Sequence, residues 1–188
     1  MRTFKDGPFP TLVAVVTTLY KGVVNATPIT WFTPCSYEPP LLFMALKQKC
    51  DTLANLRSDR EFVLQTVPYV YAQEVHNLAA PCPRDKSELN RDNLKVIMSK
   101  EVVPPRLEIA QEWFECTVTN IFGGGYSSHS FILAEVLYSS IASLEDTRLP
   151  LLNHGGLNYL TINANPELLF TVKPYKGDSD EKKPRDLF

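Results

Sequence analysis

Three stretches of the sequence gather side chains that could take part in chemistry, and the first runs from Asn25 to Ser36. It is rich in small polar groups, and it also carries one large ring: Asn25, Thr27, Thr30, Trp31, Thr33, Cys35 and Ser36. In an ordinary strand such polar groups would face water. The alternative is a row of short donors and acceptors that faces a flat polar ring, with Trp31 supplying apolar area. The pattern leaves both interpretations open.

The second stretch, from Lys47 to Thr52, joins the end of a predicted strand to the start of a predicted helix. The first N–H groups of a helix lack partners within it and carry partial positive charge. Two lysines and a hydroxyl beside them therefore indicate a phosphate site. Asp51 argues against this site, because its charge repels phosphate unless the side chain points away. The simpler alternative is a capped helix with solvated lysines.

The third stretch is the glycine run Gly123–Gly125, followed closely by His129. Its spacing fits neither the dinucleotide-binding pattern nor the P-loop, so we expect a tight hairpin turn. His129 would then begin a strand, either packed in the core or at the rim of a pocket where it bonds a substrate. The serines lie in no nucleophile elbow and the other histidines have no partner at ligand spacing, so neither a hydrolase nor a metal site is predicted.

These residues need a scaffold, and the sequence predicts one made of short strands. Apolar and β-branched runs predict strands at 11–20, 23–33, 41–46, 61–67, 109–122 and 128–140. Gly22 is expected in the turn between the first two strands, and Pro28 is expected to place the second at a sheet edge or a bulge. Asp51 or Thr52 is expected to cap a helix, and residues 71–80 are expected to form a weaker one.

The remaining segments are less regular. Residues 81–105 are polar and mixed, which favours an irregular excursion with one short helix or strand, and a short strand is expected around Tyr159. After Tyr175 the chain is charged and poor in apolar residues, which divides it into a domain, 1–175, and a mobile tail, 176–188. Many strands with few short helices predict an all-β to α+β fold, a nearly closed antiparallel barrel filled by its own side chains. A ligand would bind at its rim or between subunits.

Composition excludes several classes of protein. The chain has 188 residues, of which 44% are hydrophobic and 21% charged, with a formal net charge of −2. This balance fits one globular domain and offers no basic field for nucleic acid. The first residues lack the apolar core of a signal peptide, and no apolar run reaches about 18 residues, so we expect a cytoplasmic protein with no membrane contact. The four cysteines form no CxxC pair and are expected to be reduced thiols.

Taken together, the first two stretches resemble a family signature. Residues 25–40 read NATPITWFTPCSYEPP, and they are followed by Lys47 and then by Asp51, Thr52 and Asn55. This order resembles the flavin reductase-like FMN-binding split-barrel family, which includes flavoredoxins. Residues 128–136, SHSFILAEV, are similar to the second signature of that family. The resemblance covers roughly residues 8–159.

The resemblance implies an antiparallel split barrel that forms a homodimer, with FMN near the subunit interface and FAD as the less favoured flavin. It implies that the flavin ring and ribityl chain are lined by Asn25, Ala26, Thr27, Pro28, Ile29, Thr30, Trp31, Cys35 and Ser36. It places the phosphate end beside Lys47, Cys50, Asp51, Thr52 and Asn55. Under that assignment, Thr52→Ala should weaken FMN much more than riboflavin. His129 would lie near the flavin or an incoming nicotinamide, as the one catalytic residue.

Two residues depart from the second signature. Ser128 stands where the family has aspartate, and Ala134 stands where it has glycine, which bears on the nicotinamide contact. The first hypothesis is an enzyme in which NAD(P)H reduces bound FMN, which then passes electrons to free flavin, ferric iron or a redox protein partner. The second is a flavoredoxin-like electron carrier that another protein reduces, and the third is a barrel that has lost its cofactor. A redox role for Cys35 or Cys50 is a further hypothesis.

Overall fold

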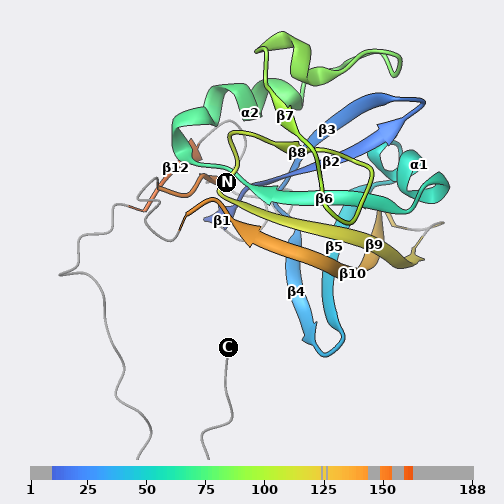
Figure 1. The fold of residues 1–188 in the computed structure, drawn as a ribbon. Coiled ribbons are helices and arrows are strands. Elements are labelled where there is room, and N and C mark those ends of the chain that lie inside the picture. The colour runs from blue at the N-terminus through green and yellow to red at the C-terminus, as the bar shows by residue number, and fades with distance from the viewer. Residues whose placement is uncertain (1–9, 124, 126, 144–148, 154–158, 163–188) are drawn as a thin grey trace, which may run out of the picture.

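The computed structural model describes residues 10–123, 125, 127–143, 149–153 and 159–162. Seven strands form one antiparallel sheet (Figure 1), in the spatial order β3 (Val23–Ile29), β2 (Ala14–Tyr20), β6 (Glu61–Thr66), β9 (Glu112–Phe122), β10 (His129–Ile141), β5 (Pro40–Lys47) and β4 (Phe32–Tyr37). Smaller sheets contain β1 (Thr11–Leu12) with β11 (Leu152–Asn153) and β12 (Tyr159–Leu160), and β7 (Val96–Ile97) with β8 (Arg106–Leu107). The predicted tail, 176–188, lies outside the described residues.

The two edges of the main sheet are joined by only two residues. β3 and β4 are its edge strands, yet β3 ends at Ile29 and β4 begins at Phe32. The chain therefore passes from one edge to the other through Thr30 and Trp31, and the Trp31 carbonyl accepts a hydrogen bond from the Ala45 N–H of β5 at 2.9 Å. A sheet whose edges lie this close is rolled up. The predicted antiparallel split barrel with a few short helices is confirmed.

Strand β2, together with Val13 just before it, is buried on both faces. Ala14 and Val16 belong to the interior cluster, whereas Val13 and Val15 pack in a second cluster with residues of helix α2 (Ala72–Leu78). All four side chains are at most 2% exposed. This two-sided burial accounts for the apolar run in the sequence, since a strand with one wet face would alternate.

Helix α1 (Asp51–Ser58) packs its leucines, Leu53 and Leu56, into the interior cluster. Its N-cap is Cys50, whose Sγ accepts a hydrogen bond from the Leu53 N–H at 3.4 Å. The predicted cap at Asp51 or Thr52 was wrong by one or two residues, because oxygen-bearing side chains are the usual caps, whereas here a thiol takes that position. No helix in the described part of the chain is long and apolar enough to cross a membrane.

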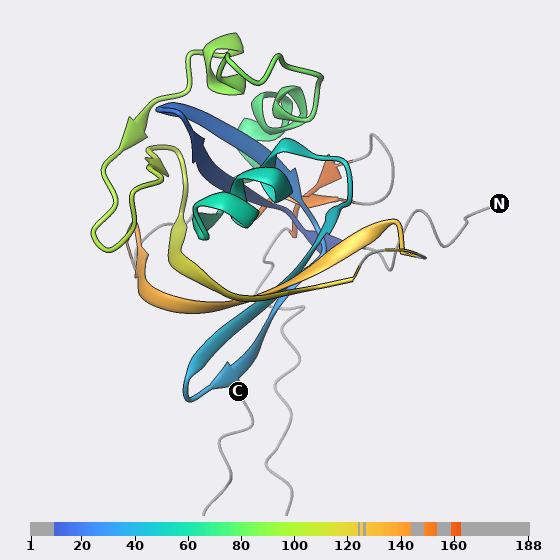
Figure 2. The same cartoon turned by 90° about the vertical axis from the view of Figure 1, so that its right-hand side faces the viewer.

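The predicted strand 23–33 is two strands. β3 runs into the barrel at the buried Ile29, and after the crossing the chain continues in β4 with the exposed Thr33. Figures 1 and 2 show β4 and β5 extending away from the rest of the barrel as a long hairpin. The prediction that Pro28 lies on an edge strand is confirmed, and so is the turn at Gly22, where the φ angle is 81°.

The predicted irregular excursion lies over the edge strand β3. It contains a 3₁₀ turn, η3 (Glu88–Arg91), and the short strand β7. The Glu88 carboxylate accepts a hydrogen bond from the Ala26 N–H at 3.1 Å, which satisfies a backbone donor at the sheet edge. The excursion therefore covers an edge that would otherwise be open.

Candidate functional site

The first and third stretches of chemically active residues meet on one surface. His129 begins β10 directly opposite Lys47, the last residue of β5. The imidazole ring of His129 lies 4.8 Å from the ring of Trp31, with 36° between their planes, and both side chains are half-buried. The Ser128 hydroxyl lies 2.8 Å from His129 Nδ1. The end of β5, the link between β3 and β4, and the start of β10 thus together form one end of the candidate site.

The second stretch joins this surface where α1 meets β3. The hydroxyl oxygens of Thr52 and Thr27 are 2.6 Å apart, and Thr52 also donates to Asn25 Oδ1 at 2.8 Å. Thr52 has no exposed surface, whereas Thr27 is half-buried. Thr52 therefore joins α1 to β3 from a buried position. Thr27 is the member of this pair that can reach a ligand.

Two other predicted ligands are also bonded within the protein. Asn25 Nδ2 donates to Glu88 at 2.8 Å, and Asn55 Nδ2 donates to the Thr18 hydroxyl at 3.0 Å. Asn55 is 1% exposed. Both amides bond to other side chains of the protein. They would therefore contribute to ligand binding indirectly, by fixing the positions of neighbouring side chains.

The excursion supplies two residues that the sequence did not single out, Arg84 and Glu88. The guanidinium of Arg84 donates to Asn55 Oδ1 at 2.7 Å, lies 3.7 Å from the Asp51 carboxylate and covers the Tyr20 ring at 3.8 Å. The Asp51 carboxylate thus faces a cation, and the positive charge of Arg84 weakens the repulsion that Asp51 would exert on a phosphate. Neither residue has a local pattern that could have revealed it, because all their partners are distant in sequence.

The remaining predicted residues are spread along β3, β4 and the start of α1. Ala26 and Ile29 have buried side chains, so only their backbone can face a ligand, whereas Pro28 and Thr30 are half-buried. On β4, the exposed Cys35 forms a bulge and is followed by the half-buried Ser36. Both belong to β4, one arm of the hairpin that projects from the barrel (Figure 2).

Two groups in the segment from the end of β5 to the N-cap of α1 differ in accessibility. Lys47 is exposed, with a side chain that can extend toward a ligand. Burial raises the pKa of the Cys50 thiol, and the hydrogen bond from the Leu53 N–H opposes that rise only in part. Cys50 is therefore a neutral cap at neutral pH rather than an anionic ligand or nucleophile.

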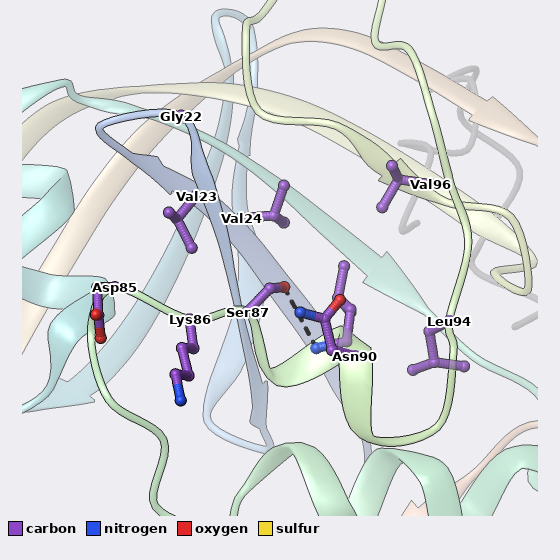
Figure 3. A pocket seen from close by; sticks show the side chains of 10 residues that line it. Gly22, Val23, Val24, Asp85, Lys86, Ser87, Asn90, Leu94 and Val96 are labelled. Carbon is purple, nitrogen blue, oxygen red and sulfur yellow. Dashed lines mark hydrogen bonds between the residues drawn. The ribbon is translucent and has the colours of Figure 1, made fainter.

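A separate hollow of about 400 Å³ lies between the β2–β3 turn and the excursion (Figure 3). Its walls include Val23 and Val24 on one side and Lys86, Ser87 and Asn90 on the other. No residue of the predicted site lines it, so the candidate site is the surface around Thr27, Trp31 and His129.

Comparison with known proteins begins with two relatives in sequence. An uncharacterised Bacillus subtilis protein, YwrF, is 35% identical over 113 residues, which cover 57% of this chain and 55% of that protein. The reductase component of a 4-nitrophenol 4-monooxygenase/4-nitrocatechol 2-monooxygenase from Rhodococcus opacus is 28% identical over 131 residues, covering 70% of this chain and 66% of that protein. The matched part thus spans between about half and two thirds of the length of these relatives.

The fold is also found in a solved structure, nitrilotriacetate monooxygenase component B from Bacillus cereus. The TM-score is 0.78 with 25% sequence identity, and the match covers 91% of this chain and 95% of that one. The family model for the flavin reductase like domain matches residues 6–160, which include every residue of the candidate site. The chain therefore belongs to the flavin reductase-like family, as the two signatures in its sequence implied.

Proposed function

We propose that this chain binds FMN on the surface around Thr27, Trp31 and His129 and catalyses its reduction by NADH or NADPH. One observation carries the proposal: the contacts Thr27–Thr52, at 2.6 Å, and Trp31–His129, at 4.8 Å, unite three stretches that are remote in sequence. A surface built from distant segments, each with groups suited to part of one ligand, is typical of a binding site.

The residues present fit a flavin. Thr27, Pro28, Thr30 and Trp31 are all half-buried, so this stretch offers both hydroxyls and apolar area, as a flat ring with polar edges requires. Lys47 supplies an exposed cation near the phosphate end, and Arg84 compensates the charge of Asp51. The same features favour FMN, since riboflavin would leave the cation without a partner.

Bound flavin would supply the hydride chemistry. The chain's own residues would bind and orient the two reactants. His129 has its Nδ1 held by the Ser128 hydroxyl, which fixes the ring and leaves Nε2 to contact an incoming nicotinamide. Hydride transfer needs no obligatory protein acid or base, so positioning is the main task of this residue.

A homodimer is part of the proposal. Phe122 and Leu137 are each 45% exposed on neighbouring strands, and Tyr37 is 77% exposed on the projecting hairpin. Exposed apolar residues of this size favour a contact with a second copy, which would cover the flavin. Electrons would pass from the bound flavin to free flavin, ferric iron or a partner protein. The likeness to the reductase component of a monooxygenase supports free flavin or a flavin-dependent partner protein as the acceptor.

A second candidate function is an electron carrier that another protein reduces. It is favoured by Ser128, whose neutral hydroxyl occupies the position beside His129 where the family has an aspartate. A hydroxyl brings no negative charge beside the imidazole, whereas an aspartate carboxylate would.

Stopped-flow mixing distinguishes the two functions. Protein loaded with FMN is mixed with NADH and, separately, with NADPH, and the flavin absorbance is followed. We expect rapid bleaching with at least one nucleotide. Slow bleaching with both, at the rate of free FMN, would reject the reductase in favour of the carrier, and purified protein that binds no flavin would reject both.

A further inference from the structure

The hydrogen bonds behind the candidate site run in one direction, which is set by Arg84 and Glu88. A guanidinium can only donate hydrogen bonds, and an ionised carboxylate can only accept them. Side-chain amides and hydroxyls can do both. The two charged residues, one at each end of a chain of such groups, therefore determine how every group between them is oriented.

From the cationic end, Arg84 donates to Asn55 Oδ1 at 2.7 Å. Asn55 must then turn Nδ2 toward Thr18, whose hydroxyl oxygen accepts at 3.0 Å. The proton of the Thr18 hydroxyl is thereby directed to Asn25 Oδ1, at 3.2 Å. Thr18 and Asn55 are each 1% exposed, so water does not compete for these groups.

From the anionic end, the carboxylate of Glu88 accepts from Asn25 Nδ2 at 2.8 Å and from the Ala26 N–H at 3.1 Å. Asn25 must then present Oδ1 to the hydroxyls on its other side. Thr52 donates its proton to that oxygen at 2.8 Å, as Thr18 does. The two ends thus require the same orientation of the Asn25 amide.

The consequence reaches the ligand surface at Thr27. Thr52 has used its only hydroxyl proton on Asn25, so in the 2.6 Å contact between the two threonines Thr27 must be the donor. Thr27 then has no proton left and offers only oxygen lone pairs. Its hydroxyl makes no other hydrogen bond within the described part of the chain, and the residue is only half-buried, so the oxygen is open to a ligand.

We propose that Thr27 recognises a hydrogen-bond donor on the flavin, either a ribityl hydroxyl or the imide N–H of the ring. Glu88 and Arg84 are positioning residues that keep Thr27 in its accepting state. The inference rests on the proposed function, because it requires a flavin at this surface. It excludes Thr27 from binding phosphate oxygens or ring carbonyl oxygens, which can only accept.

Binding of three flavins tests the role of Thr27: riboflavin, lumiflavin without the ribityl chain, and N3-methylriboflavin without the imide proton. Thr27→Val removes the oxygen at similar shape, and Thr27→Ser keeps it. We expect Thr27→Val to weaken riboflavin about tenfold and Thr27→Ser to have less than about a twofold effect. Lumiflavin should be insensitive to Thr27→Val if the donor is a ribityl hydroxyl, and N3-methylriboflavin should be insensitive if it is the imide.

Glu88→Gln tests the direction of the bonds, because a glutamine amide can donate to Asn25 and let that residue turn over. We expect Glu88→Gln to weaken riboflavin, and the double variant with Thr27→Val to bind no more weakly than Thr27→Val alone. Glu108→Gln, at an exposed glutamate, is the matched control and should bind as the wild type does. Melting temperatures identify any variant that fails to fold. If Glu88→Gln does not fold, the comparison of the three flavins with the Thr27 variants tests the inference on its own.

Equal loss for all three flavins on Thr27→Val would overturn the inference, and so would additive losses in the double variant. Either result, with flavin still bound by the wild type, would leave the proposed function standing. Wild-type protein that binds none of the three flavins would overturn the proposed function and the inference together.

Discussion

The indole of Trp31 and the imidazole of His129 lie 4.8 Å apart although one residue belongs to the link between the two sheet edges and the other begins β10. The link passes from β3 to β4, and the Trp31 carbonyl is bonded to β5, the strand that pairs with β10. Barrel closure therefore brings these rings together. A planar ligand bound at the proposed site would lie against this contact.

Trp31 should report flavin binding. The chain has two tryptophans, and Trp113 is buried in the second cluster with its Nε1 bonded to the Leu107 carbonyl at 3.0 Å. Because a flavin stacked near Trp31 would quench its emission, we expect Trp31→Phe to remove most of the fluorescence change seen on adding FMN. Trp113→Phe should retain it. Full quenching in Trp31→Phe would place the flavin elsewhere.

Thr52→Ala should act through stability and not through the phosphate. Thr52 is fully buried and bonded to Asn25 and Thr27, so its truncation removes two hydrogen bonds at a cost of about 1–3 kcal/mol in the free energy of unfolding. We expect FMN and riboflavin to be weakened alike, in contrast to the expectation from the sequence. Urea unfolding and titration with both flavins check the two statements.

Phosphate recognition is better tested at Lys47, with Lys49 as the matched control. Both lysines are exposed, but only Lys47 lies opposite His129. We expect Lys47→Ala to weaken FMN several-fold relative to riboflavin, with a difference that shrinks at high salt, and Lys49→Ala to change the ratio little. An unchanged ratio in Lys47→Ala would remove this residue from the phosphate end.

The main strands could be predicted from the sequence because they are apolar on both faces or bounded by clear turns. The break between β3 and β4 could not, since residues 29–33 have uninterrupted strand character and barrel closure decides where the chain turns. Trp31 and His129 could be singled out from the residue types around them, and the resemblance to the family implied their roles. Arg84 and Glu88 could not be singled out, because charged residues in a polar segment are expected to face water. Their partners, Asn55 and Asn25, are distant in sequence and are seen only in the folded chain.

A buried ion pair predicts how stability depends on pH. Burial alone raises the pKa of Glu115, but the N–H groups of Glu101 and Lys100 and the guanidinium of Arg106, with its Nε at 2.6 Å, outweigh it and hold the pKa below its ordinary value. A carboxyl with a lowered pKa stabilises the fold fully above its unfolded value, about 4.3, and less as pH falls through the folded value.

We therefore expect the free energy of unfolding to fall as the pH drops below about 4.3. Glu115→Gln should cost about 3–5 kcal/mol at pH 7, because it leaves Arg106 charged and buried, and should flatten this acid dependence. Urea unfolding at several pH values measures both effects. Glu101→Gln is the control, since that exposed residue bonds Glu115 through its backbone. If Glu115→Gln leaves the acid dependence unchanged, other carboxyl groups cause the loss of stability at low pH.

The thiols at the site should be structural. Cys50 caps α1, and burial raises the pKa of its thiol, so the reactive thiolate is scarce at neutral pH. Cys116 is fully buried, and burial raises its pKa further, whereas Cys35 is exposed at the β4 bulge. A chromogenic disulfide reagent should thus modify Cys35 first, Cys50 slowly and at a rate that rises with pH, and Cys116 only after unfolding.

The same reasoning predicts the effect on electron transfer. Serine is a better helix cap than cysteine, so Cys50→Ser should preserve α1 and change the rate of flavin reduction by less than about twofold. Cys35→Ser should do the same, because this thiol is exposed on the projecting hairpin and serine replaces it at similar size. Stopped-flow reduction of both variants decides the matter. A large fall in rate in either, with flavin affinity retained, would give that cysteine the redox role that its surroundings argue against.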